Sequence, residues 1–265
     1  MMATFYSRCT GTSTRRLIPL FLFLSLTTGL FAQEPHNQAF AALARAEYQT
    51  ALDRFQSDTN NLTNVWQFAR ACFDFSDYTT NDIQRADVAI QGIAASRQYL
   101  ARQPKSVAGH YYLALNLGEL ARTELLGALK LVREMEGEFK KAANLNPKFD
   151  YAGPERNLGL LYRDAPGWPT SIGSRRKART MLEQAAKLAP DYPENLLNLI
   201  ETRLQWKDSN DARRELKALD ALWLGAQTNF TGVKWESSWA DWTARRQKAH
   251  QELDEPPTKS GVTNR

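Results

Sequence analysis

The sequence predicts an all-α fold, a solenoid of antiparallel helix pairs with a capping helix at each end. The clearest helix pair runs from Glu155 to Pro190. Apolar and small residues recur there at helical steps, first Leu158, Gly159 and Tyr162, and then Ala178, Leu182, Ala185 and Pro190. Steps of three and four residues place side chains on one face of a helix, and the final proline marks the end of the second helix.

This spacing is typical of a tetratricopeptide repeat. Small residues such as Gly159 and Ala178 let two antiparallel helices approach closely, and larger apolar residues fill the space between them. One helix pair cannot bury its apolar face alone, so neighbouring pairs must stack around a continuous core. Function in such a stack resides on a surface, here expected to be the concave one, and not in a catalytic pocket.

Weaker copies of the spacing lie on both sides of the clearest one, so we expect four units. The fourth unit has Leu224 in place of the final proline. The matching positions are Phe68, Ala69, Cys72, Gly92, Ser96, Tyr99 and Pro104 in the first unit, Leu113, Ala114, Leu117, Phe139, Ala142 and Pro147 in the second, and Leu199, Ile200, Arg203, Ala212, Leu216 and Leu219 in the fourth.

A capping helix is expected before the first unit and another after the last. Apolar residues from Phe40 to Phe55 recur at steps of three and four residues, which indicates an amphipathic helix. Trp235, Trp239 and Trp242 share one helical face after the fourth unit. Because terminal repeats must cover an exposed apolar face, we expect these tryptophans to seal the stack. An aromatic ligand-binding box is the alternative.

The N-terminus predicts export to the periplasm. Three arginines precede the apolar run from Leu17 to Leu26, which is too short to span a bilayer. We expect residues 1–32 to be a signal peptide cleaved near Ala32, residues 33–253 to form the solenoid domain, and residues 254–265 to be a disordered tail. No cysteine stands directly after the apolar run, and Cys9 lies before it, so a lipid anchor is not expected. An uncleaved anchor is the alternative.

Charge and cysteine content narrow the class of protein. The chain has 34 basic and 29 acidic residues; residues 1–32 hold three of the arginines and no acid, which leaves 31 basic against 29 acidic residues in the rest. This near-neutral balance argues against nucleic-acid binding. Cys72 is the one cysteine after residue 32, and its place between Phe68 and Phe75 indicates a small core residue.

Patterns associated with catalysis are missing from the sequence. The three histidines are dispersed, no cysteine or histidine pair has metal-ligand spacing, and no glycine-rich loop could hold phosphate. We therefore expect no enzyme activity, no catalytic residue, no metal site and no cofactor. A pair of catalytic carboxylates is the alternative that the sequence leaves open.

The third unit has an insertion between its helices, from Arg163 to Gly173. Two prolines, two glycines and a tryptophan predict a stiff loop with Trp168 as an apolar anchor. Together with the helices around it, this loop resembles the T component of TRAP transporters. The resemblance covers about Ala108 to Glu201 and rests on five segments, which are His110–Glu119, Asn146-Pro147, Arg156–Tyr162, Ala165-Pro166 and Ser171–Gly173.

The resemblance implies a secreted, tetratricopeptide-like protein that accompanies a periplasmic substrate-binding protein for small organic acids and related ligands. The lipoprotein cysteine is missing here, which puts membrane tethering in doubt. On the residues themselves, the first helix of each pair should line the inner surface. Arg156, Leu160 and Arg163 form one stripe there, and Tyr112 and Asn116 belong to another.

Two arginines on one helix face suit a ligand carboxylate, because guanidinium groups pair with it bidentately. Solvated arginines held by Asp164 or Glu155 are the alternative. Asn116 is either a satisfied buried amide or faces a polar cavity, and Trp168 either walls that cavity or pins the loop. The predicted ligand- or partner-binding residues are Tyr112, Asn116, Glu119, Arg156, Tyr162, Arg163, Trp168 and Ser171.

We therefore interpret the chain as a non-enzymatic periplasmic protein, accessory to a TRAP-type transporter, that handles a small organic acid or apolar ligand or docks the substrate-binding protein. The alternative is a secreted tetratricopeptide scaffold for envelope proteins. A ligand handler needs an enclosed channel lined by Asn116, Arg156 and Trp168, whereas a scaffold needs an open groove. The sequence does not decide whether the protein forms a homo-oligomer.

Overall fold

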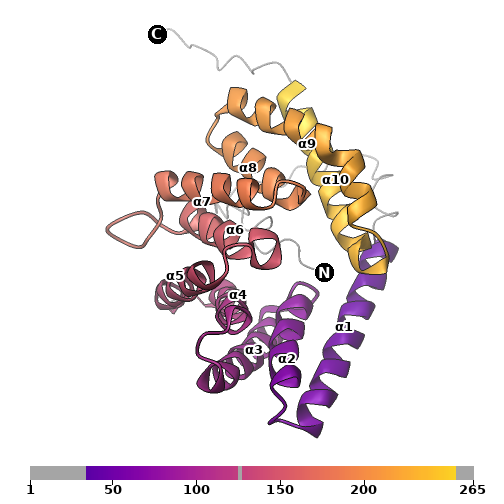
Figure 1. Cartoon of the computed structure of the whole chain (residues 1–265), viewed down its shortest axis with the longest axis vertical. Coiled ribbons are helices and arrows are strands. Elements are labelled where there is room, and N and C mark those ends of the chain that lie inside the picture. Colours follow the sequence, from indigo (N-terminus) through magenta and orange to yellow (C-terminus); the bar gives the residue numbers. More distant parts are fainter. Residues whose placement is uncertain (1–33, 125–126, 255–265) are drawn as a thin grey trace, which may run out of the picture.

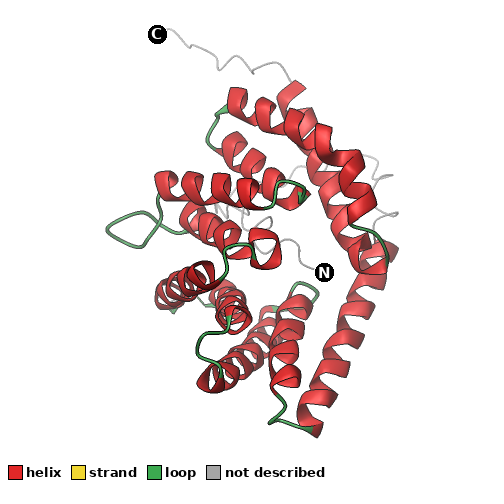
Figure 2. Cartoon of the chain, viewed as in Figure 1, coloured by secondary structure: helices red, strands yellow, loops and turns green. Residues whose placement is uncertain are grey.

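The computed structural model describes residues 34–124 and 127–254, which form ten helices and no strand (Figures 1 and 2). The predicted signal peptide and the tail from residue 255 lie outside the described residues. The helices are α1 (Glu34–Ser57), α2 (Leu62–Ser76), α3 (Asp82–Arg102), α4 (Val107–Thr123), α5 (Ala128–Leu145), α6 (Phe149–Asp164), α7 (Arg175–Leu188), α8 (Pro193–Gln205), α9 (Ser209–Asn229) and α10 (Val233–Asp254).

The helices pair as the repeat spacing predicts, which confirms the all-α solenoid. The four pairs are α2 with α3, α4 with α5, α6 with α7, and α8 with α9, and they stack along the long axis of the molecule (Figure 1). Helix α1 packs on the first pair and α10 on the last. Helix α10 also meets the connection between α2 and α3, where the Tyr78 hydroxyl oxygen lies 3.0 Å from that of Ser237.

Local sequence fixes where several helices begin. Asn61, Asn81, Ser106 and Ser174 each accept a backbone N–H bond at the first turn of α2, α3, α4 and α7. Such side-chain oxygens satisfy amide groups that have no partner within the helix. The start of each of these helices is therefore determined by a residue that the sequence shows directly.

Two apolar clusters make up the core. The first contains residues of α1 to α8, including Cys72, which is fully buried as expected. The second lies in α8, α9 and α10 around Trp242, whose side chain is fully buried, with Trp223 and Trp235 also buried. The expectation that the C-terminal tryptophans seal the stack is thus confirmed, since their rings pack on each other and on the last pair.

The close contact within the third pair depends on Gly159. A Cβ atom added there would lie 2.8 Å from Leu182 Cγ and 3.1 Å from the Leu182 backbone nitrogen. Because backbone cannot move aside as a flexible side chain can, any larger residue would push α6 and α7 apart. Gly137 on α5 is different, as nothing lies within 4 Å of its added Cβ.

We predict that Gly159→Ala lowers the free energy of unfolding by about 1 to 3 kcal/mol through overpacking of α6 against α7. The matched variant Gly137→Ala should raise it by up to about 1 kcal/mol, since alanine favours the helix and meets no neighbour. Urea denaturation of both variants measures the difference. Equal stability of the two variants would contradict the assigned helix contact.

Candidate functional site

Helix α6 begins with a left-handed turn at its N-terminus. Asp150, Tyr151 and Ala152 have φ angles of 50°, 54° and 63°, a conformation that costs an L-residue about 1 to 2 kcal/mol. Arg156 holds the turn, because its guanidinium donates to the Tyr151 carbonyl oxygen at 3.1 Å. Asn195 of α8 donates to the same oxygen at 3.0 Å. The turn is therefore stabilised by the next helix pair.

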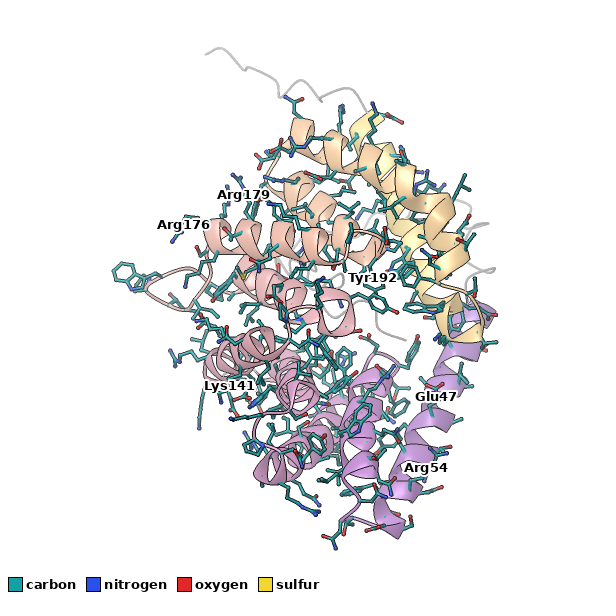
Figure 3. All side chains as sticks on the ribbon, viewed as in Figure 1. Glu47, Arg54, Lys141, Arg176, Arg179 and Tyr192 are labelled. Atoms are coloured by element: carbon teal, nitrogen blue, oxygen red, sulfur yellow. The ribbon has the colours of Figure 1, made fainter. Side chains whose placement is uncertain are left out.

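Arg156 is the centre of a buried polar network between three inner helices. Its guanidinium donates to Asn195 Oδ1 at 3.1 Å and lies 3.5 Å from the Asp150 carboxylate. The Tyr111 hydroxyl of α4 donates to the same carboxylate at 2.7 Å. Burial raises the pKa of Asp150, and Arg156 opposes that rise. The guanidinium also stacks 5.3 Å from the ring centroid of Tyr192, the residue directly before α8, which is labelled in Figure 3.

This network corrects both interpretations of the arginine pair. Arg156 is only 4% exposed and pairs with Asp150, so it is neither a solvated residue held by Glu155 nor a guanidinium open to a ligand carboxylate. Arg163 pairs with Asp164, the partner that the alternative named, through two hydrogen bonds of 2.6 and 2.9 Å, but its side chain is only 4% exposed and so is not solvated. It also donates to Thr202 of α8 at 3.2 Å. Both arginines join α6 to α8.

The second predicted stripe is also occupied by internal contacts. The Asn116 amide is fully buried and donates to the carbonyl oxygens of Ala69 and Tyr112 at 2.9 and 2.8 Å. It is thus a buried amide against α2, not a residue that faces a cavity. Glu119 is fully buried and lies 3.2 Å from Arg122. Burial raises the pKa of Glu119 to about 8.

The loop between α6 and α7 is ordered by its own hydrogen bonds and not by Trp168. The Trp168 side chain is 89% exposed, so it neither walls a cavity nor pins the loop. Ile172 packs on the core instead, and the Gly173 and Ser174 amides donate to the carbonyl oxygens of Pro166 and Tyr162 at 2.9 and 2.8 Å. The remaining predicted residue of the loop, Ser171, has a buried hydroxyl without a described partner.

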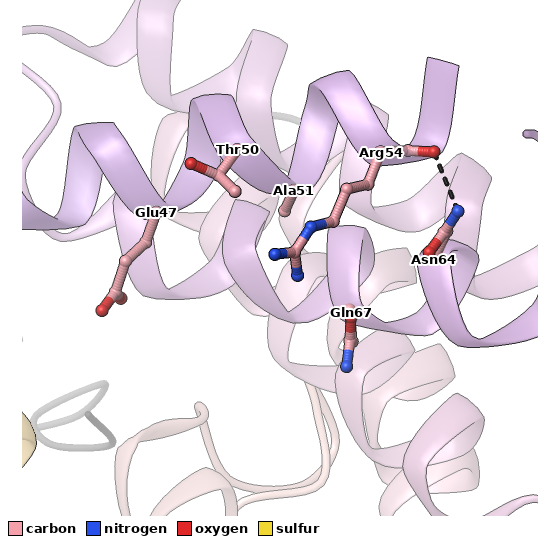
Figure 4. Close-up of a pocket in the computed structure, with 6 residues that line it drawn as sticks. All are labelled: Glu47, Thr50, Ala51, Arg54, Asn64 and Gln67. Carbon is pink, nitrogen blue, oxygen red and sulfur yellow. Dashed lines mark hydrogen bonds between the residues drawn. The ribbon is translucent and has the colours of Figure 1, made fainter. Parts of the chain in front are cut away.

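Three of the surface grooves lined by described residues are candidate binding pockets. The smallest, about 230 Å³, lies between α1 and α2 around Glu47, Arg54 and Asn64 (Figure 4), and is below the usual size of a ligand site. Two larger grooves of about 600 and 740 Å³ separate outer helices, the first between α5 and α7 and the second between α7 and α9. Tyr162 is the only predicted site residue that lines any of the three.

The predicted channel lined by Asn116, Arg156 and Trp168 is therefore wrong, because these side chains face different parts of the molecule. The groove between α5 and α7 is also lined by three residues that were not predicted from the sequence, which are Glu155, Arg176 and Lys177. The signal for Glu155 is its charge at a repeat position where the fourth unit carries the apolar Leu196. The described residues contain no cluster of three or more metal-ligating side chains.

Comparisons with known proteins agree with this architecture. The family model described as Regulator of microtubule dynamics protein 1-3 matches residues 32–152. The crystal structure of TTC0263, a thermophilic TPR protein of Thermus thermophilus, is similar with a TM-score of 0.56 and 18% identity, over 83% of this chain and 98% of that chain. The chain has a tetratricopeptide-like fold. No curated protein matches it. In the described part, no helix is long and apolar enough to cross a membrane.

We predict that Arg156→Gln lowers the free energy of unfolding by about 3 to 5 kcal/mol, because it leaves the Asp150 carboxylate buried without its cation. The exposed Arg176 on the neighbouring helix provides a control, and Arg176→Gln should change stability by less than about 0.5 kcal/mol. Chemical denaturation monitored by tryptophan fluorescence measures both. Wild-type stability of Arg156→Gln would show that the network is dispensable and would reopen the ligand interpretation.

Proposed function

We propose that the chain is a non-enzymatic scaffold for protein–protein contacts whose partner docks on the loop between α6 and α7. The observation that supports this is Trp168, a tryptophan that is 89% exposed in the hydrogen-bonded loop between α6 and α7. This loop projects from the stack beside α7 (Figure 1). Tryptophan is enriched among the residues that dominate binding energy at interfaces. A loop that is already ordered loses little entropy when a partner binds.

Basic residues at the start of α7 extend this surface. Arg175, Arg176, Lys177 and Arg179 are exposed, and α7 begins one residue after the loop ends. The Arg175 and Arg179 guanidinium groups lie 5.6 and 5.8 Å from the ring centroid of Trp206, which orients them. Complementary charge steers association, so the partner should carry an apolar pocket for Trp168 with acidic residues beside it.

The T component of a TRAP transporter is a more specific form of this proposal, in which the partner is a periplasmic substrate-binding protein. Its support is that the Ala-Pro and Ser-Ile-Gly segments of the resemblance build the loop. Gly173 lies against the Ala165 carbonyl oxygen so closely that no Cβ would fit. The matched family model ends at residue 152, before this loop, and gives no argument about its partner. Ligand handling through an enclosed channel loses support, because Asn116 and Arg156 are occupied by internal contacts and Trp168 is exposed.

We predict that Trp168→Ala removes partner binding without loss of stability, since the side chain has almost no contacts to lose. A fall in affinity of about 30-fold or more is expected for a hot-spot tryptophan. Leu224→Ala is the matched control, because Leu224 is 77% exposed on α9 away from the loop. Affinity capture from the native envelope with mass spectrometry should find a protein retained by wild type and Leu224→Ala and lost by Trp168→Ala. Equal retention by all three would contradict the proposal.

The proposed location is the periplasm, which rests on the sequence of residues 1–32 alone. We predict that the protein recovered from a periplasmic fraction begins near Gln33, because the signal peptide is cleaved after Ala32. N-terminal sequencing of the purified protein measures this. A protein with an intact N-terminus in the cytosol would contradict both the export signal and a periplasmic partner.

A further inference from the structure

The grooves between neighbouring outer helices differ at one repeat position. Three residues before the leucine of the repeat spacing, the second, third and fourth units carry His110, Glu155 and Leu196. These side chains are equivalent by register and leave the inner helix of each unit toward the outer helices. Their surroundings can therefore be compared directly.

In two of the three units, the side chain at this position has its contacts within the chain. The His110 ring nitrogens lie 2.5 Å from a Glu138 carboxylate oxygen of α5 and 3.0 Å from the Pro104 carbonyl oxygen. Leu196 is apolar and belongs to the C-terminal core cluster. Neither unit leaves a polar group at this position without a partner.

In the third unit, the side chain at this position has an oxygen atom without a hydrogen-bond partner among the described residues. Glu155 is only 4% exposed, and its Oε2 atom is shielded from solvent and has no hydrogen-bond partner among the described residues. Burial raises the pKa of this carboxyl to about 7, and a hydrogen bond from its own backbone amide opposes the rise. Buried carboxylate oxygens in native proteins nearly always accept hydrogen bonds, so this one indicates a missing donor.

Glu155 lies at the floor of the groove of about 600 Å³ between α5 and α7, a volume typical of ligand sites. The floor consists of buried α6 residues, and the rim consists of side chains from the two outer helices. The floor residues are Glu155, Leu158 and Tyr162, and the rim includes Lys140, Asn144, Arg176, Lys177, Met181 and Gln184.

The cations at the rim are not equivalent. Lys140 pairs with Glu136 at 2.6 Å, and the Lys177 ammonium lies 4.8 Å from the ring centroid of Tyr162. Arg176 is exposed and forms no ion pair with a described residue; Figure 3 labels it on α7, on the side of the molecule away from α1 and α10. The groove therefore offers an unpaired acceptor at its floor and an available cation at its rim.

We propose that this groove binds a short peptide, or a peptide-like zwitterion, with its ammonium group on Glu155 and its carboxylate on Arg176. Charge-assisted hydrogen bonds favour an ammonium donor over a neutral one at a buried carboxylate. The Leu158 and Met181 side chains provide apolar contact for small side chains between the two ends. The site shares Arg176 and Lys177 with the basic surface beside the loop, but Trp168 does not line it and its ligand does not depend on the scaffold function.

Isothermal titration of the whole protein with trialanine tests this site. Wild type should bind trialanine, and Glu155→Gln should bind it at least tenfold more weakly. N-acetyl-trialanine, which has no ammonium group, should bind wild type at least tenfold more weakly than trialanine does, but should lose little further affinity in Glu155→Gln. Trialanine amide, which has no carboxylate, should likewise bind wild type at least tenfold more weakly than trialanine does, but should lose little further affinity in Arg176→Gln. Such cycles assign each end of the peptide to one residue.

Arg179→Gln is the matched control, because Arg179 is also an exposed arginine of α7 but pairs with Asp208 at 3.2 Å outside the groove. It should bind trialanine as wild type does. Glu155→Gln should melt at or above the wild-type temperature at pH 8, since it removes an unpaired buried charge, so its weaker binding would not reflect unfolding. Absence of trialanine binding to wild type, or wild-type affinity in Glu155→Gln, would overturn the proposal.

The pH dependence provides a separate readout. Affinity should be greatest between about pH 7 and 8, because Glu155 must be ionised and the peptide amino group must keep its proton. It should fall below that range as Glu155 is protonated, while the facing Lys140, Arg176 and Lys177 stay charged. Trp168→Ala should bind trialanine normally, so failure of this site and failure of the scaffold function can be told apart. A pH-independent affinity would contradict the role of Glu155.

Discussion

The buried contact of Arg156 with Asp150 and Asn195 is the interaction on which the arrangement of the stack depends. The core is divided into two apolar clusters, and this polar network lies where the third pair meets the fourth. It also holds the left-handed turn that begins α6, so one guanidinium stabilises both a strained backbone and the junction between repeats. Breaking such a pair leaves a charge without solvent or partner, which is far more costly than losing a surface ion pair.

The inner helices impose a general constraint on polar residues. In α4, α6 and α8 almost every side chain along three turns is buried, including charged ones such as Glu119 and Arg203. A helix buried on all sides has no solvated face, so a polar group on it needs a partner within the protein. Arg245 of α10 does this for α8, where it pairs with Glu194 at 2.9 Å and Glu201 at 2.7 Å. Most charged residues on these helices therefore stabilise the stack, and Glu155 of α6 is the exception.

Functional surfaces are then left to the loop and to the grooves between outer helices. The Trp168 loop and the Glu155 groove lie on the same repeat but offer different chemistry, an exposed aromatic ring in one case and a buried acceptor in the other. Repeats with a common backbone can diverge in this way, because a single position decides whether a groove is closed by an internal hydrogen bond, filled by an apolar side chain, or left open. The histidine, glutamate and leucine at that position illustrate the three outcomes.

The sequence by itself determined the repeat architecture, because contacts such as Gly159 with Leu182 lie between helices close in the chain and leave a regular spacing. It also identified the capping tryptophans and the buried Cys72. It could not decide what Arg156 or Asn116 contacts, since their partners lie on other repeats, 39 and 47 residues away in the chain. Helical periodicity places a residue on a face but does not say what covers that face. Only the tertiary structure decided that, because burial and pairing depend on how successive repeats stack.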